Sequence, residues 1–578
     1  MRKLLKYMKG YTREVIIAPL FKLIEAAFDL TVPLVVASII NNGIANGEAG
    51  LSHVYKMCGV LVLLAVLGLA FSITAQFFSA KAAVGFSTKL RRAVFEKIQG
   101  LSYSELDSVG TSTLITRMTS DINQVQNGVN LTLRLFLRSP FIVFGAMIMA
   151  FTVDVKAALV FVAVIPILSA VVFGIMLKTM PLHKNVQKGL DKVTRITREN
   201  LGGVRVIRAF CREDAEISDF EKENNSLNII QQLAGKISAL LNPVTYIIIN
   251  IATIALIHTG AVRVSLGDLN QGDVVALYNY MGQILVELIK LASLIITISK
   301  ALACSDRIST VLDLESSLEK TDGEQSETDF KVEFKNVSLR YKNASEDSLT
   351  GISFAVKAGQ TVGIIGGTGS GKTSLINLIP HLYDSTEGAV MVDGKNVKSY
   401  DEVELRDKIG VATQKSVLFK GTIRENLIWR KPDATDSELM HAAEIAQAAE
   451  VINSKESGLD SVVEQDGRNF SGGQRQRLSI ARALVGEPEI LILDDSSSAL
   501  DYATDARLRT AIRELDYNPT IFIVSQRTSS IRHADLIVVL DDGEVCGLGT
   551  HDELLGSCEV YREIHESQFE KEDGGASK

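Results

Sequence analysis

Gly366-Gly367-Thr368-Gly369-Ser370-Gly371-Lys372-Thr373 is a glycine-rich loop that ends in a lysine and a hydroxyl residue. Glycines let backbone N–H groups turn inward around phosphates, the lysine supplies positive charge, and the threonine hydroxyl can hold Mg²⁺. An apolar run at 362–365, typical of a buried strand, precedes the loop, and a helical pattern from Ser374 follows it. This stretch therefore predicts a nucleotide-binding α/β domain.

A second acidic element lies further along the chain, where Asp494 ends the apolar run 490–493. A carboxylate at the end of a strand can bind Mg²⁺ in P-loop ATPases. Continuous apolar runs at 362–365, 490–493 and 521–524 are typical of parallel strands that are buried on both faces. We therefore expect residues 330–578 to form one α/β domain that binds ATP and Mg²⁺.

A third motif, Phe470-Ser471-Gly472-Gly473-Gln474, identifies the family that the chain resembles. It is similar to the signature motif of ABC transporters, and the resemblance extends over the whole chain. The resemblance implies the following sites: ATP at Tyr341, Gly366, Gly367, Thr368, Gly369, Ser370, Gly371, Lys372, Thr373, Ser374 and Gln414; Mg²⁺ at Thr373, Gln414 and Asp494; and the partner's ATP at Ser471, Gly472, Gly473, Gln474 and Asp501. Asp501 belongs to the stretch Ser498-Ala499-Leu500-Asp501, which is similar to the family's D-loop.

Two positions depart from the family pattern where the chemistry takes place. The resemblance implies a catalytic Glu after Asp494, but the residue here is Asp495, which is one methylene shorter. It also implies a His at the position of Gln526, and a glutamine side chain cannot take up a proton near neutral pH. A catalytic group misplaced by ~1 Å can cost on the order of a hundredfold in rate. We therefore expect a degenerate site that binds ATP and hydrolyses it slowly.

The intact signature motif predicts a partner. Ser471 is expected to begin a helix, and the N-terminus of a helix favours anions. In the family this end closes over ATP held by the other half. The chain thus resembles the degenerate-site subunit of bacterial heterodimeric ABC exporters, with a second half-transporter as its partner.

The first half of the chain is predicted to be an all-α transmembrane domain of six helices. A helix needs about 20 apolar residues to cross a bilayer. The expected spans are residues 15–40, 57–80, 139–153, 157–177, 243–262 and 274–302. The first span contains Lys22, Glu25 and Asp29 and is counted because an even number keeps both ends of the domain on one side.

Positive charges set the expected orientation. Residues 81–138 contain eight Lys and Arg and residues 178–236 contain eleven, whereas residues 41–53 contain none. The positive-inside rule places both long segments and both termini, and with them the ATPase domain, in the cytoplasm. The resemblance to bacterial exporters implies that the membrane, crossed several times, is the bacterial cell membrane. Each long segment is expected to be a hairpin of helices with arms of roughly 40 Å.

The domain boundaries follow from composition. We expect a transmembrane domain at 1–313, a solvated acidic linker at 314–329 and the ATPase domain at 330–578. The net charge of −8 argues against a nucleic-acid partner. The five cysteines show no metal-ligand spacing, which favours free thiols.

Charges inside the expected spans have two interpretations. Lys22, Glu25 and Asp29 share one helical face, and Glu287 and Lys290 are three residues apart on the last span. Such charges can mark a substrate path, but pairs that fix helix packing are the interpretation we favour. The residues do not identify the substrate; the resemblance implies a small amphipathic compound, a drug or a lipid-like molecule. A homodimeric exporter with weak ATPase activity and a regulatory ABC protein are the alternative functions.

Overall fold

The computed structural model describes residues 2–321, 323, 327–342, 344–496 and 500–573. The chain forms two compact units, and residues 100–111 group with the second unit although they lie within the first half of the sequence. The first unit contains residues 1–99 and 112–314, and the second contains residues 100–111 and 315–578. By their internal contacts, the first unit ends at Leu314, and residues 100–111 belong with the second unit.

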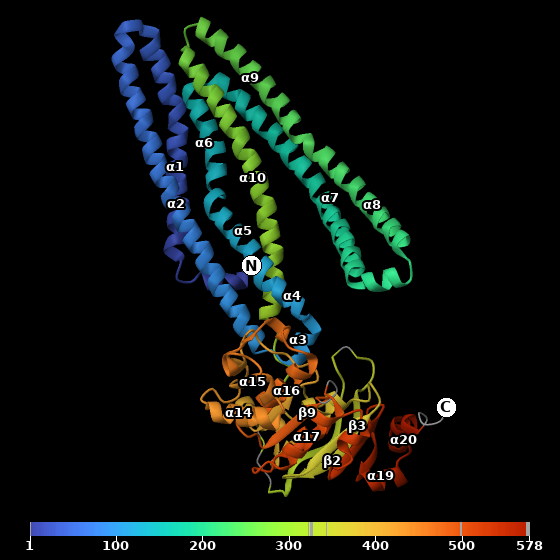
Figure 1. The fold of residues 1–578 in the computed structure, drawn as a ribbon. Helices are drawn as coiled ribbons and strands as arrows, with labels where there is room; N and C mark the ends of the chain where they lie inside the picture. The colour runs from blue at the N-terminus through green and yellow to red at the C-terminus, as the bar shows by residue number, and fades with distance from the viewer. Residues whose placement is uncertain (1, 322, 324–326, 343, 497–499, 574–578) are drawn as a thin grey trace. The chain divides into compact units, whose positions relative to one another are not determined.

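The first unit is helical. Its α-helices are α1 (Thr12–Ser38), α2 (Leu51–Gln99), α4 (Thr111–Thr116), α5 (Ile122–Leu135), α6 (Arg138–Val153), α7 (Val155–Ala209), α8 (Glu213–Ala239), α9 (Leu241–Ser265) and α10 (Gln271–Leu312). Figure 1 shows α1 beside α2, and α7 beside the continuous path of α8 and α9. The inner segment 178–236 therefore forms a helical hairpin of α7 and α8, as the sequence predicted, whereas the segment 81–138 is divided among α2, residues 100–111, α4 and α5.

Five helical stretches of the described chain are long and apolar enough to cross a membrane. The first stretch, Thr12–Gln99, contains both α1 and α2. One expected span falls in each of α1, α2, α6, α7, α9 and α10. The turn between α6 and α7 is as short as expected: Asp154 caps α7, and its Oδ1 accepts a hydrogen bond from the Ala157 N–H at 2.7 Å.

The second unit combines sheets with short helices. Its strands are β1 (Phe330–Leu339), β2 (Leu349–Lys357), β3 (Thr361–Gly366), β4 (Glu387–Val392), β5 (Lys395–Asn396), β6 (Ile409–Ala412), β7 (Gly421–Thr422), β8 (Val462–Val463), β9 (Ile490–Asp494), β10 (Thr520–Val524), β11 (Leu536–Asp541) and β12 (Glu544–Gly549). Its helices are α3 (Tyr103–Val109), α11 (Lys372–Leu378), α12 (Glu402–Asp407), α13 (Ile423–Leu427), α14 (Asp436–Ile445), α15 (Ala449–Asn453), α16 (Gly472–Leu484), α17 (Tyr502–Arg513), α18 (Thr528–Ile531), α19 (His551–Ser557) and α20 (Glu559–Asp573).

The main sheet has the strand order β12-β11-β3-β10-β9-β6, in which every strand except β12 is parallel to its neighbours. Strands β9 and β10 are almost wholly buried, because helices and a second sheet cover both faces. The second sheet, β2-β1-β4-β5, is antiparallel, and its apolar side chains join one core with those of β3 and α11. The predicted α/β architecture is confirmed.

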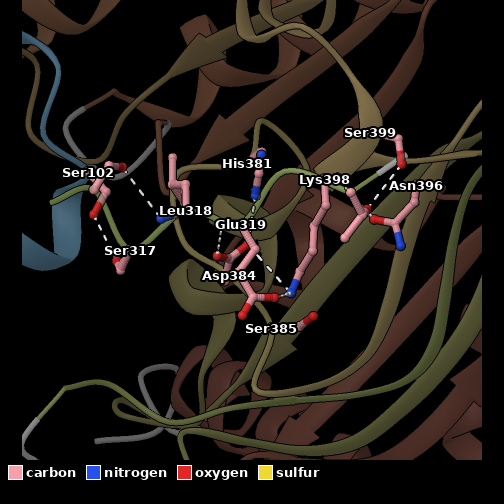
Figure 2. A network of polar contacts seen from close by, with 12 residues as sticks. Ser102, Ser317, Leu318, Glu319, His381, Asp384, Ser385, Asn396, Lys398 and Ser399 are labelled. Carbon is pink, nitrogen blue, oxygen red and sulfur yellow. Dashed lines mark hydrogen bonds and ion pairs between the residues drawn. The ribbon is translucent and has the colours of Figure 1, made fainter. Parts of the chain in front are cut away.

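The sequence predicted a solvated linker, but the structure shows that part of it is bound to the second unit. The Glu319 N–H donates to Asp384 Oδ2 at 2.7 Å, the Thr321 N–H donates to the Lys398 carbonyl at 3.1 Å, and the Lys398 ammonium contacts Glu319 at 2.9 Å. Figure 2 shows these groups meeting around Asp384. The linker residues 315–321 therefore lie along the second unit, because the Glu319 N–H and the half-buried Asp384 carboxylate satisfy each other there.

The segment 100–111 is held by the same unit. The Glu105 carboxylate is buried and accepts hydrogen bonds from the Ser102 hydroxyl and, at 3.3 Å, from the Ser317 N–H. Asp107 accepts a hydrogen bond from the Tyr383 hydroxyl at 2.6 Å. Burial opposes ionisation of Glu105, but these hydrogen bonds outweigh it and hold the pKa of the carboxyl below its usual range.

Candidate nucleotide-binding site

Parallel strand pairing brings the predicted site residues to one edge of the main sheet. Val524 lies opposite Ile364 on one side and opposite Asp494 on the other, and Ala412 lies opposite Leu493. The glycine-rich loop, Gln414, Asp495 and Gln526 follow these strands by one or two residues. The sheet register thus places four segments, 160 residues apart at the extremes (366 and 526), at the carboxyl ends of adjacent strands.

The glycine-rich loop runs from the end of β3 to the start of α11. A Cβ atom on Gly366 would lie 2.0 Å from the Leu540 carbonyl oxygen, so only glycine fits against β11. Gly371 has φ +93, and a Cβ there would lie 2.6 Å from the Ser348 carbonyl oxygen. Gly367, Thr368 and Gly369 are exposed, which leaves the top of the loop open to a ligand.

Lys372 lies across the loop. Its ammonium donates hydrogen bonds to the carbonyls of Gly366 at 3.0 Å and Gly367 at 2.5 Å and to the Ser370 hydroxyl at 3.3 Å. Burial lowers its pKa, and the carboxylates of Asp495 and Asp494 act in the opposite direction. The loop therefore holds a positive charge at its centre, where the phosphates of a nucleotide would contact it.

Thr373 and Asp494 form a site that fits Mg²⁺. The Thr373 hydroxyl lies 3.2 Å from each oxygen of the Asp494 carboxylate. A hydroxyl and a carboxylate are oxygen ligands of the kind that Mg²⁺ binds together with nucleotide phosphates. The described residues contain no cluster of three His, Cys, Asp or Glu that could hold a metal alone. The ion would therefore be held jointly by Thr373, Asp494 and a bound nucleotide.

Asp495 has a constrained backbone. Its φ is +43, a left-handed conformation that costs a residue with a side chain roughly 1–2 kcal/mol. Its N–H donates to the Val524 carbonyl at 3.0 Å, and its carbonyl accepts from the buried Gln476 amide at 3.2 Å. These two bonds fix the Cα position of Asp495, so that the length of its side chain decides how far its carboxylate reaches.

The two adjacent carboxylates influence one another. Burial raises the pKa of Asp494, and the charge of Asp495 raises it further. Burial also raises the pKa of Asp495, whereas the Gln414 amide, 3.5 Å from its Oδ2, and the charge of Lys372 act to lower it. The edge of the sheet therefore concentrates negative charge at a place where a divalent cation would relieve it.

Tyr341 lies beside the glycine-rich loop. Its hydroxyl donates to the Ser374 hydroxyl at 2.9 Å, which joins the segment after β1 to the first turn of α11. The ring meets Tyr383 edge-on at 5.1 Å between centroids. Tyr341 and Ser374, both predicted to bind ATP, are thus brought together.

Gln526 occupies an exposed position after β10. Its carbonyl accepts a hydrogen bond from the Gln568 amide at 2.7 Å, and the Gln568 Oε1 accepts one from the Thr528 N–H at 2.9 Å. One side chain of α20 thus satisfies two backbone groups of the loop that carries Gln526.

The signature residues begin α16 as expected. Ser471 caps the helix: its hydroxyl accepts a hydrogen bond from the Gln474 N–H at 3.3 Å, while Gln474 Oε1 accepts from the Ser471 N–H at 2.9 Å. Ser471 and Gly472 are exposed, and so is Asp501, which caps α17. Ser498 and Ala499 lie outside the described residues.

Two contacts were not predicted from the sequence. Tyr383 touches both Tyr341 and the segment 100–111, where its ring lies 6.0 Å from that of Tyr103. Gln568 holds the Gln526 loop. Neither residue belongs to a local motif, and both act across long sequence separations, so that the sequence carries no signal for them.

Comparison with known families agrees with this geometry. The model of the ABC transporter transmembrane region matches residues 15–288, and the model of the ABC transporter ATPase matches residues 349–498. The two matches fall in the helical first half and in the α/β second half of the chain.

Individual relatives and one solved structure cover most of the chain. The ABC transporter ATP-binding protein YfiB of Bacillus subtilis is 38% identical over 99% of both chains. The ATP-dependent lipid A-core flippase of Syntrophus aciditrophicus is 31% identical over 84% of this chain and 81% of its own. A bacterial Atm1-family ABC exporter solved with ATP bound has the same fold, with a TM-score of 0.81 at 23% identity over 96% of this chain and 99% of that one.

Proposed function

Because the chain belongs to the ABC transporter family, we propose that it is one half of a heterodimeric exporter of amphipathic compounds whose own ATP site hydrolyses slowly. As an ABC transporter with an ATPase domain, the chain couples ATP hydrolysis to transport. In the proposed pair, two ATP sites form, each between the glycine-rich loop of one half and the signature motif of the other. Only one of them, the partner's, performs rapid hydrolysis in this proposal.

The pair Asp495 and Gln526 carries the proposal. The backbone of Asp495 is fixed by hydrogen bonds to Val524 and Gln476, so that its shorter side chain cannot be compensated by a shift of the Cα atom. The side chain of Gln526 has no proton-accepting nitrogen. With a short carboxylate and no imidazole, attack of water on the terminal phosphate is poorly assisted.

The binding half of the site favours retention of ATP. The glycine-rich loop, Lys372, Thr373 and Asp494 have the residue types and the contacts that phosphates and Mg²⁺ require. The exposed Ser471 and Gly472 at the start of α16 are available to a nucleotide on another chain. In this proposal the signature motif completes the partner's hydrolysing site, and the membrane is the bacterial cell membrane with the ATPase domain in the cytoplasm.

The test compares ATPase activity of the purified chain alone and together with a candidate partner half that has Glu and His at the corresponding positions. We expect little activity alone and strong activity for the pair. Ser471→Arg in this chain should abolish the activity of the pair, since it blocks the partner's site.

Vigorous ATPase of the chain alone would overturn the degenerate-site proposal in favour of a homodimer. Active ATPase of the pair without substrate movement into vesicles would favour a regulatory protein.

A further inference from the structure

A cavity of about 380 Å³ lies among the first, third and last expected membrane spans, α1, α6 and α10. Its lining is Asp29, Val32, Arg138, Ile142, Gly282, Gln283, Val286, Glu287 and Lys290. Small-molecule sites occupy volumes of roughly 300–1,000 Å³ and combine apolar walls with a few polar groups. This cavity has both features.

A buried pair forms the base of the cavity. Arg138 lies between two carboxylates: its NH1 group contacts Glu287 Oε1 at 2.7 Å and its NH2 group contacts Asp29 Oδ2 at 2.9 Å. Ser139 donates to the other Glu287 oxygen at 2.7 Å. The side chains of Arg138 and Glu287 are 12% and 4% exposed, so these two residues serve helix packing. This agrees with the paired-charge interpretation of the sequence.

The outer members of the cluster are different. The Asp29 side chain is 44% exposed and the Lys290 side chain is 43% exposed, although each has an ion-pair partner. Beside Asp29, the Gln283 amide nitrogen donates to the Asp29 carbonyl at 3.3 Å. The Gln283 Oε1 oxygen is buried and has no hydrogen-bond partner among the described residues. The cavity thus presents an anion, a cation and an acceptor that lacks a donor.

We propose that this cavity binds a zwitterionic amphipath that bears a primary ammonium group and an anionic group. The ammonium contacts Asp29 and Gln283 Oε1, the anion contacts Lys290, and the apolar part lies against Val32, Ile142 and Val286. This proposal rests on the proposed export function and specifies its substrate class.

Charge and hydrogen bonding determine this class. Two acidic and two basic residues line the cavity, so its lining has no net charge and favours a ligand without net charge. An acceptor without a donor needs a hydrogen-bond donor, which a primary ammonium provides and a quaternary ammonium does not. Buried charges are expensive in a membrane and often mark a transport path.

A second arginine that lies between two carboxylates provides a matched control. Arg263 lies between Asp154, 6% exposed, and Asp268, 45% exposed, at 2.8 and 2.5 Å. Asp268 matches Asp29 in residue type, exposure and arginine partner, but it does not line the cavity. Asp268→Asn therefore measures the effect of losing such an ion pair alone.

The experiment measures equilibrium binding of radiolabelled lysophosphatidylethanolamine to the purified full-length chain in detergent, with unlabelled competitors. Lysophosphatidylcholine with the same acyl chain should compete at least about tenfold less well, since the loss of one charge-assisted hydrogen bond corresponds to a tenfold change or more. Two soluble competitors, O-phosphoethanolamine and a zwitterionic dipeptide with an aromatic side chain, distinguish the source of the ligand. Competition by either of them indicates a soluble zwitterion, whereas competition by unlabelled lysophosphatidylethanolamine alone indicates a lipid.

Variants test the assigned residues. Asp29→Asn and Lys290→Gln should each weaken binding about tenfold or more, whereas Asp29→Glu should restore most of it and Asp268→Asn should change it less than about twofold. A thermal unfolding curve for each variant identifies any loss of fold, and the Glu variant separates charge from packing.

Equal competition by the two lysolipids, or binding that Asp29→Asn leaves intact, would overturn the proposal. Because binding is measured without ATP, its failure is separate from failure of the ATPase test above.

Discussion

The two sides of the nucleotide site differ in completeness. The phosphate side, formed by the loop 366–373 and Asp494, has the residue types and the hydrogen bonds that nucleotide binding requires. The water side, formed by Asp495 and Gln526, has a carboxylate one methylene short and an amide in place of an imidazole. In the proposed function, binding and hydrolysis are carried by different side chains at the strand ends of one sheet, so that one can weaken while the other is preserved.

The physical demands on the two sides explain this independence. Phosphate binding depends on backbone geometry, and Gly366 cannot be replaced without moving β11. Water activation depends on the reach and proton affinity of two side chains, which single substitutions alter without disturbing the fold.

The largest effect is expected from a substitution on the phosphate side of the nucleotide site. Lys372→Ala should weaken ATP binding by the chain on the order of a hundredfold, since it removes the only charge that crosses the loop in the described residues and a charged partner of a phosphate contributes several kcal/mol. Equilibrium binding of a fluorescent ATP analogue measures this. Lys415→Ala, an exposed lysine after Gln414, is the control, and equal losses for both variants would contradict the assignment.

The next largest effect is expected from restoring the family's residue types on the water side of the nucleotide site. Asp495→Glu together with Gln526→His should raise ATPase activity of the chain with its partner, and single-site turnover at this site by about ten- to a hundredfold, because reach and proton uptake are both restored. Measurement with the partner's own site inactivated isolates this site. Unchanged turnover would mean that these two residues do not limit hydrolysis.

A smaller effect should follow from detaching Tyr383, which links the binding side to the segment 100–111. Tyr383→Phe keeps the ring against Tyr341 and loses the 2.6 Å hydrogen bond to Asp107. Amide hydrogen exchange in residues 100–111 should become about tenfold faster, in line with the loss of a hydrogen bond to a charged group. Tyr103→Phe is the control, since its hydroxyl makes no hydrogen bond among the described residues.

Gln568→Ala tests how α20 holds the loop that carries Gln526, on the water side of the site. It leaves the Gln526 carbonyl and the Thr528 N–H without the partners they have in α20, which should destabilise the second unit by about 1–2 kcal/mol. The midpoint of thermal unfolding should fall by about 2–4 °C per kcal/mol. Ser567→Ala, whose hydroxyl bonds only within α20, should have a smaller effect.

The smallest effect concerns pH. Burial raises the pKa of Asp495, so the folded chain holds this proton more tightly than the unfolded chain does, and its contribution to stability grows as the pH falls through the folded-state pKa. Asp495→Asn should therefore be more stable than the parent at neutral pH, and the difference should shrink toward acidic pH. Unfolding midpoints of both proteins from neutral pH down to about pH 4, near the usual pKa of an aspartate, measure this, and a constant difference would contradict it.

Local patterns predicted much of the molecule. The glycine-rich loop, the acidic strand end at Asp494, the cap at Ser471 and the apolar helices were all predicted from residues close together in the sequence, and the structure places them as expected. The linker was predicted to be solvated because it is acidic, yet Glu319 and Thr321 are bound to the second unit. Composition reports the polarity of a segment and not whether its backbone finds partners.

By itself the sequence determined which residue types stand at each step of the nucleotide site, including the substitutions at Asp495 and Gln526, because those are matters of chemical identity and order along the chain. Only the tertiary structure decided that Asp107 meets Tyr383, that Gln568 holds Gln526, and that Asp29 and Lys290 stay half-exposed around one cavity. Such contacts join residues tens to hundreds of positions apart. Their formation depends on strand register and helix packing, which are set by the whole core and leave no periodic mark in the sequence.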